Sequence, residues 1–236
     1  MSSKWSALLS ATFHEPGYDH LIELVHQRDP DARRRLAALD VSIYDEGGKL
    51  LHGWPVETGQ EIVDLDARLR DAAVRERVMV VLDARYDETV FPYRPHHYGY
   101  LHRRGSSSPP LYYAVSSALG GVPDRLGAAT RLNNFDTYLF RRGPFAERCS
   151  VMLGNLARFA AAEAQVFAYY GTDRVGHAVQ LGPRAHVEVP LAREHAGQAL
   201  ARVETKSLFR LASYVVRRRE PAGDLALFDH LFTYFK

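Results

Sequence analysis

The chain has 236 residues, of which 46% are hydrophobic and 25% charged, and its formal net charge is +2 at pH 7. This composition is typical of a folded globular protein and excludes a disordered chain. The small net charge gives no overall attraction to nucleic acid, and no apolar run approaches the ~20 residues that span a bilayer. We therefore expect neither a nucleic-acid partner nor membrane insertion.

Cysteine usage and the N-terminal residues both bear on the compartment. Cys149 is the single cysteine, so the chain cannot form an internal disulfide. Residues 1–11 hold one lysine and a short, interrupted apolar patch, which is not the pattern of a secretory signal. Both observations favour a cytoplasmic protein.

Residues 1–37 are predicted to form a short helical N-terminal extension. Leu21, Leu24 and Val25 share one face of a helix, and the helical pattern extends over residues 5–37. Asp29 followed by Pro30 is typical of a helix start, with the aspartate as cap and the proline in the first turn.

Residues 38–104 are predicted to form a first β module. The stretch 41–44 alternates as a strand does, and 49–54 returns after the turn Asp45-Glu46-Gly47-Gly48, where Gly-Gly accepts the positive φ of a tight hairpin. Further strands are predicted at 61–65, 77–84 and 98–102.

Residues 105–143 are predicted to be a loop with connecting strands, and residues 144–236 a second β module. The arginine, glycine, serine and proline residues of 103–110 mark either a domain linker or a loop. Strands are predicted at 111–116, 137–140, 150–155, 164–170, 178–181, 185–189, 208–216 and 225–235. Short strands at near-regular spacing favour antiparallel sandwiches.

The two β modules follow a similar plan, which predicts an internal repeat of residues 41–104 in residues 151–236. Residues 52–65 match residues 177–191 in their order of strand, glycine and strand, and the apolar strand at 78–82 matches 208–216. The predicted fold is therefore mainly β, with two related antiparallel sandwich-like modules.

The last third of the chain adds a family resemblance. Residues 163–236 contain a strand at 164–170, a turn through Asp173, an arginine-bearing strand at 184–189 and a late strand at 226–234 with leucine and tyrosine. This pattern resembles the soluble β-sandwich proteins of the sensory rhodopsin transducer type. The resemblance implies an antiparallel sandwich, oligomerisation and a binding role, and it carries over no functional residue.

The segment 93–104 is the densest in side chains that suit a ligand. On an extended strand His96, Tyr98, Tyr100 and His102 share one face, and His97 lies on the other with Gly99 and Leu101. Rings stack on a sugar or a base, imidazoles hydrogen-bond, and arginines bind anions. The alternative is an exposed amphipathic edge strand without a ligand. The predicted ligand-binding residues are Tyr93, Arg94, His96, His97, Tyr98, Tyr100, His102 and Arg104.

A metal-dependent enzyme is the alternative function. His186 and Glu188 share a strand face, and with His230 they imitate a two-histidine, one-carboxylate iron site. The candidate ligands are His52, His96, His97, His102, His186, Glu188 and His230.

The sequence contains no complete catalytic set, so we predict no catalytic residue, metal or cofactor. The first function hypothesis is a non-enzymatic binding or assembly protein. It would hold a small polar ligand (a sugar, a nucleotide or an anion) or a protein partner, and we expect it to form a homo-oligomer.

Overall fold

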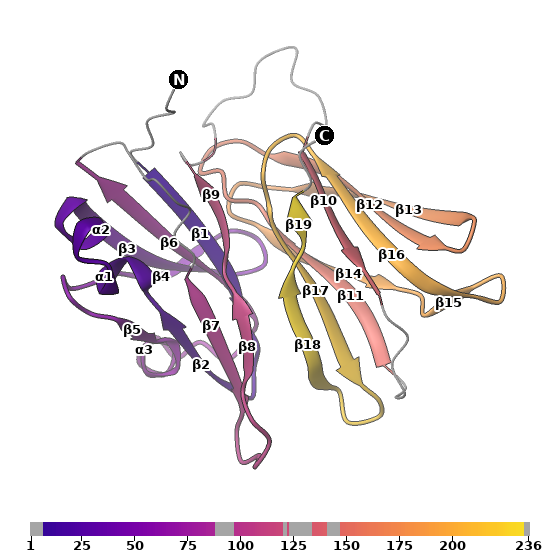
Figure 1. The fold of residues 1–236 in the computed structure, drawn as a ribbon, viewed down its shortest axis with the longest axis horizontal. Coiled ribbons are helices and arrows are strands. Elements are labelled where there is room, and N and C mark those ends of the chain that lie inside the picture. The colour runs from indigo at the N-terminus through magenta and orange to yellow at the C-terminus, as the bar shows by residue number, and fades with distance from the viewer. Residues whose placement is uncertain (1–6, 88–96, 120–121, 123–133, 141–146, 234–236) are drawn as a thin grey trace. The chain divides into compact units, whose positions relative to one another are not determined.

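A computed structural model describes residues 7–87, 97–119, 122, 134–140 and 147–233 (Figure 1). These residues form nineteen strands in antiparallel sheets and three short helices, which confirms the predicted mainly β, sandwich-like class. The chain divides into two units, Met1–Val122 (unit 1) and Pro123–Lys236 (unit 2). No helix among the described residues is long and apolar enough to span a membrane.

Unit 1 consists of two antiparallel sheets. The five-stranded sheet has the order β4-β3-β6-β1-β9, and the four-stranded sheet has the order β5-β2-β7-β8. The strands are β1 Ala7–His14, β2 Tyr18–Glu23, β3 Leu36–Tyr44, β4 Leu50–Pro55, β5 Ile62–Asp64, β6 Val78–Tyr86, β7 Tyr98–Arg103, β8 Leu111–Ala114 and β9 Ser116–Leu119. The helices are α1 Val25–Arg28, α2 Pro30–Arg35 and α3 Leu65–Asp71.

The predicted N-terminal helix is wrong for most of its length. Residues 7–14 and 18–23 are strands β1 and β2, and only residues 25–35 contain helix. The capping prediction is confirmed, because Asp29 accepts hydrogen bonds from the backbone N–H groups of Asp31 and Ala32, and Pro30 begins α2. Strand β1 lies between β6 and β9 and is buried along almost its whole length, so its sequence lacks the alternation that identifies a strand.

The predicted hairpin at residues 41–54 is confirmed. Strands β3 and β4 pair antiparallel, and the Gly48 N–H donates to the Asp45 carbonyl at 3.0 Å. Gly48 has a φ of +87°, a conformation that glycine adopts without a Cβ clash. The Asp45 carboxylate accepts from the Lys49 N–H at 2.8 Å and fixes the same turn.

The segment after Arg103 connects neighbouring strands of one sheet. Strands β7 and β8 pair antiparallel, so residues 104–110 form a hairpin connection within unit 1. Of the two readings of this segment, the structure therefore supports the loop. The division between the units falls at Val122 and Pro123.

Unit 2 also consists of two antiparallel sheets. The first has the order β13-β12-β16-β10-β19, with β15 paired to β16, and the second has the order β14-β11-β17-β18. The strands are β10 Asn134–Leu139, β11 Glu147–Gly154, β12 Ala162–Tyr170, β13 Asp173–Leu181, β14 His186–Leu191, β15 Glu194–His195, β16 Gln198–Ser207, β17 Ala212–Arg219, β18 Asp224–His230 and β19 Phe232–Thr233. Strand β16 was not predicted.

The two units share one strand order. With β15 set aside, β4-β3-β6-β1-β9 corresponds position by position to β13-β12-β16-β10-β19, and β5-β2-β7-β8 corresponds to β14-β11-β17-β18. This correspondence pairs β4 and β5 with β13 and β14, as the sequence match of 52–65 with 177–191 did. It pairs β6 with β16, whereas the sequence match paired residues 78–82 of β6 with residues 208–216, which lead into β17. That sequence match is therefore wrong.

Each unit has a different polar contact in its interior. In unit 1 the Tyr113 hydroxyl lies 2.6 Å from Thr12 Oγ1 and 2.7 Å from His20 Nε2, which joins the two sheets. In unit 2 the fully buried Asn155 amide donates to the carbonyls of Ala160 at 2.8 Å and Gly182 at 2.9 Å. These contacts satisfy polar groups that would otherwise be buried at a cost.

Candidate functional site

Strand β7 places the candidate residues on two opposite faces. Tyr98, Tyr100 and His102 point away from the interior of unit 1, whereas His97, Gly99 and Leu101 are buried. This alternation confirms the predicted faces for these residues. The candidates Tyr93, Arg94 and His96 lie outside the described residues.

A tyrosine cluster covers the outward face of the sheet β5-β2-β7-β8. Tyr112 of β8 lies opposite Tyr100 of β7 in the register. The Tyr112 ring stacks on Tyr98 with centroids 5.0 Å apart and an interplanar angle of 20°, and it lies 5.0 Å from the Tyr100 ring at 53°. Tyr112 is 56% exposed, so the cluster presents aromatic surface to solvent.

A shallow hollow of about 360 Å³ lies beside the tyrosine cluster. The Tyr100 hydroxyl donates to Glu23 Oε2 at 2.8 Å, Arg28 forms an ion pair with Glu23, and Arg28 Nε lies 3.6 Å from Glu61 Oε2. The hollow therefore combines an aromatic ring with a chain of hydrogen-bonding groups. Its lining residues are Leu21, Glu23, Arg28, Glu61, Ile62 and Tyr100.

The phenols of Tyr100 and Tyr112 stay protonated at neutral pH, because the pKa of each is raised. The hydrogen bond from Tyr100 to Glu23 is the main cause that raises the pKa of Tyr100. Burial, followed by the neighbouring phenols of Tyr98 and Tyr100, raises the pKa of Tyr112 to about 12. The Tyr100 proton is donated to Glu23, so the Tyr100 oxygen is left as an acceptor for a ligand hydroxyl.

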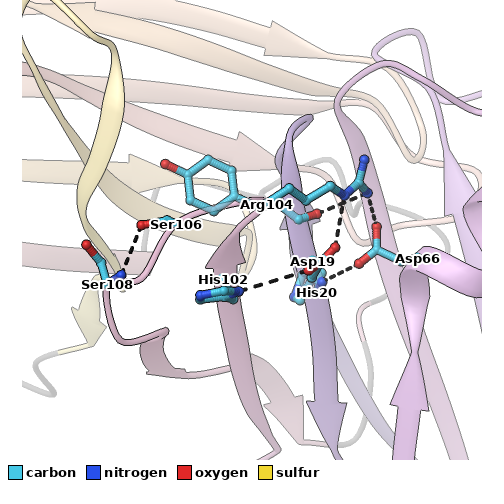
Figure 2. Close-up of polar contacts among 8 residues, drawn as sticks. Asp19, His20, Asp66, His102, Arg104, Ser106 and Ser108 are labelled. Atoms are coloured by element: carbon cyan, nitrogen blue, oxygen red, sulfur yellow. Dashed lines mark hydrogen bonds and ion pairs between the residues drawn. The ribbon is translucent and has the colours of Figure 1, made fainter.

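The other end of the β7 face is an ion-pair cluster around Arg104 (Figure 2). Arg104 reaches from the end of β7 to Asp19 on β2, at 2.9 Å from its Nε to Oδ1, and to Asp66 on α3. The second oxygen of Asp66 accepts the His20 backbone N–H at 2.7 Å, and His102 Nδ1 lies 4.0 Å from Asp19. Two carboxylates thus pair with Arg104, and the arginine links β2, α3 and the end of β7.

The inward residues of β7 belong to the interior of unit 1. His97 is 1% exposed, and its carbonyl accepts the Val115 N–H at 2.8 Å. The Tyr113 ring lies over Gly99, and its hydroxyl reaches the fully buried His20. His97 therefore has no direct access to a ligand on the tyrosine face.

Among the described candidates for metal ligands, His52, His102, His186 and His230 lie on four separate strands, β4, β7, β14 and β18. Glu188 and His230 lie in one row of the sheet β14-β11-β17-β18, with Met152 and Tyr214 between them. Three strand spacings of about 4.8 Å, or about 14 Å, separate them, so the predicted iron site with His186 does not converge. Across residues 7–87, 97–119, 122, 134–140 and 147–233, no group of three or more His, Cys, Asp or Glu side chains is placed to hold a metal ion.

Several residues of the site were missed in the sequence. Tyr112 belongs to the predicted strand 111–116 but was not assigned to the site, although Tyr112-Tyr113 beside a histidine-tyrosine strand was a usable signal. Glu23, Arg28 and Asp66 reach β7 only through the register of β2 and the position of α3. No local sequence pattern identified Glu23, Arg28 and Asp66 as site residues.

A comparison of the chain with protein-family models and with curated proteins finds no match.

Proposed function

We propose that unit 1 is a non-enzymatic binding module that holds a small polar ligand on the tyrosine cluster and the adjoining hollow. The observation that carries this proposal is a row of side-chain contacts beside exposed aromatic rings. A hydrogen bond and two ion pairs link Tyr100, Glu23, Arg28 and Glu61 in this order. Ligand sites commonly combine apolar and aromatic surface with a few polar groups that fix orientation.

The chemistry of the hollow favours an uncharged sugar over a nucleotide or an inorganic anion. Glu23 and Glu61 carry two negative charges against the single positive charge of Arg28, and Arg104 is already paired with Asp19 and Asp66. An anion would meet net negative charge there. A sugar has apolar C–H faces that pack on tyrosine, and its hydroxyls both donate to carboxylates and accept from guanidinium or phenol.

Calorimetric titration with neutral oligosaccharides, uronic acids and nucleotides tests this proposal. We expect a neutral sugar to bind and the anionic ligands to bind at least about tenfold more weakly. Tyr112→Ala removes the exposed ring and Tyr100→Phe removes only the hydroxyl, so both should weaken sugar binding. Phe159→Ala removes a 74% exposed ring of unit 2 and is the matched control.

Two results contradict the proposal. Either no member of the ligand panel binds, or the Tyr112→Ala and Tyr100→Phe variants bind the sugar as tightly as the parent protein. If a protein partner binds instead and Tyr112→Ala abolishes that complex, the cluster is a protein interface and the sugar is excluded.

We further infer that the two units are copies of one sandwich module and that the protein works as a homo-oligomer in the cytoplasm. The common strand order of the units supports the repeat. The inference of a homo-oligomer rests on the resemblance of residues 163–236 to the transducer-type sandwiches. The inference of a cytoplasmic location rests on the single cysteine. Light scattering on the purified protein tests the oligomer, and a monomer at all concentrations contradicts it.

A further inference from the structure

The strands β13, β12, β16 and β10 of one unit 2 sheet are drawn in orange and rose in Figure 1. The outward face of this sheet interleaves aromatic rings with cations. The register places Tyr169 beside Arg202, and it places Lys206 opposite Phe135. Val166, Ala168, Val203 and Thr205 alternate with these side chains and are buried, so the rings and cations point outward. We call this the aromatic–basic face; it consists of Phe135, Phe167, Tyr169, Arg174, Arg202 and Lys206.

Each cation of the aromatic–basic face lies over a ring. The Arg174 guanidinium carbon is 4.6 Å from the centroid of Phe167, and Arg202 is 4.0 Å from that of Tyr169. The Lys206 ammonium is shared, at 5.4 Å from the Phe167 centroid and 5.3 Å from the Phe135 centroid. Neighbouring strands thus present ring surface and positive charge side by side.

Gly176 creates the room for the central ring. It lies opposite Phe167 on β13, and a Cβ added at Gly176 would be 3.2 Å from Cε1 of Phe167. The glycine therefore lets the Phe167 ring lie close to the backbone of the neighbouring strand. This close approach holds the Phe167 ring between the backbone of β13 and the Arg174 guanidinium.

The charge of the face is positive. Arg174, Arg202 and Lys206 contribute three positive charges, and Glu204 lies between them. Glu204 accepts the Tyr169 hydroxyl at 2.5 Å and lies 3.2 Å from Arg202, so its negative charge is held within the face. Glu163 lies beyond Gln165 toward the start of β12. The near-zero net charge of the whole chain does not oppose a local positive surface.

We infer that the aromatic–basic face binds single-stranded nucleic acid. Bases stack on the rings of Phe167, Tyr169 and Phe135, and phosphates replace the rings as partners of the three cations. The face carries exposed apolar side chains at its edge as well, since Leu139 is 65% exposed and Phe135 43%. A second copy of the same face is a poor occupant, because it would oppose cations to cations.

We expect this face to prefer single-stranded over duplex nucleic acid and to bind different base sequences about equally. A base offers the same kind of π-face whatever its identity, whereas the duplex hides its faces inside the stack. Three phosphate contacts predict that log K falls with log salt concentration with a slope of about −2. The inference concerns unit 2 and is independent of the proposed sugar site in unit 1.

Fluorescence anisotropy on the full chain tests the inference, with a labelled oligo(dT) of about 12 nucleotides as the probe and the matching duplex as competitor. We expect the single strand to bind and the duplex to compete poorly. Phe167→Leu and Tyr169→Leu keep apolar volume but remove the ring, so each should weaken binding by roughly tenfold. Phe159→Leu removes a ring outside the face and should bind as the parent does.

Lys206→Gln and Arg174→Gln leave the rings in place and provide a second readout. Each should lower the magnitude of the salt slope by about 0.7. The inference is overturned if the parent binds no oligonucleotide at low salt, if duplex competes as well as single strand, or if the ring variants bind unchanged. It is also overturned if vesicles of phosphatidylcholine and phosphatidylserine capture the protein while the oligonucleotide does not.

Discussion

The ring of Tyr113 occupies the space that a side chain at Gly99 would need. A Cβ added at Gly99 would lie 2.1 Å from Cζ of Tyr113, far inside contact distance. The two residues are paired directly across β7 and β8. The tyrosine can therefore cross the interior of unit 1 and reach Thr12 and His20 because position 99 has no side chain.

Gly99→Ala should destabilise the protein by about 3 kcal/mol, because the buried ring of Tyr113 would have to move and its two hydrogen bonds would be broken. Urea unfolding measures the change. Gly53→Ala is the control, since the nearest atoms to its Cβ would be at 3.5 Å, and its effect should stay within about 0.5 kcal/mol. Equal stability of the Gly99→Ala variant and the parent would contradict the packing of Tyr113 over Gly99.

Tyr113→Phe should cost about 2 kcal/mol, because Thr12 and His20 are fully buried and both lose the hydroxyl. The ring stays in place, so the loss reports the polar contact and not the packing. Tyr112→Phe, on the exposed side of the same strand, should change the unfolding free energy by less than about 0.5 kcal/mol. If the two variants are equally stable, the Tyr113 hydroxyl does not join the sheets.

Stability should fall as the pH falls from 6.5 to about 4. Burial lowers the pKa of His14 from 6.5 to about 4, against the opposing effect of Asp66, and burial also lowers the pKa of His20. In this window the unfolded chain binds protons that the folded chain does not, so acid favours unfolding. His14 alone predicts a loss of about 3 kcal/mol.

Unfolding free energies measured in urea at pH 7.5 and at pH 4.5 give the loss of stability between the two pH values. His14→Gln should reduce this loss of stability at acid pH, because the variant lacks the buried imidazole whose pKa is lowered. An unchanged loss in the His14→Gln variant would show that other groups cause the acid sensitivity.

Asp66→Ala should destabilise the protein by about 3 kcal/mol. The change leaves the His20 N–H without its acceptor and removes one of the two carboxylates that hold Arg104. Asp19→Asn is the control, because the Asp19 side chain is half exposed and its pair with Arg104 is screened by solvent, so its cost should stay below about 1 kcal/mol. The opposite ranking in thermal or urea unfolding would contradict the role of Asp66.

Local sequence patterns identified some strands and misassigned others. Strand β2 alternates buried and exposed residues, but Leu21, Leu24 and Val25 also share one face of a helix, so the segment was predicted as a helix. The hairpin β3–β4 carries its turn signal at Gly47-Gly48, and β6 is rich in valine. Strand β1 is buried on both faces, so it has no alternation. Strand β16 alternates Arg202, Glu204 and Lys206 with inward residues that include the buried polar Thr205 and Ser207, which hides its apolar face.

Only the part of the candidate site that lies on strand β7 could be predicted from the sequence. The alternation within β7 follows from strand geometry, so the faces of Tyr98, Tyr100 and His102 could be assigned. Glu23 and Tyr112 join Tyr100 through pairing with β2 and β8, which depends on register across the whole sheet. The ion pair between Arg104 and Asp66 could not be predicted for the same reason, since Asp66 lies on helix α3, 38 residues away in sequence.

Because both units arrange their strands in the same order, each position in one unit has a counterpart in the other, and misassembly between domains is a characteristic failure of such tandem chains. The interiors select against exchange. A strand that carried Tyr113 into unit 2 would lose Thr12 and His20, and a strand that carried Asn155 into unit 1 would lose its carbonyl acceptors. The two buried polar contacts thus give each unit an interior that fits its own strands better than those of the other unit.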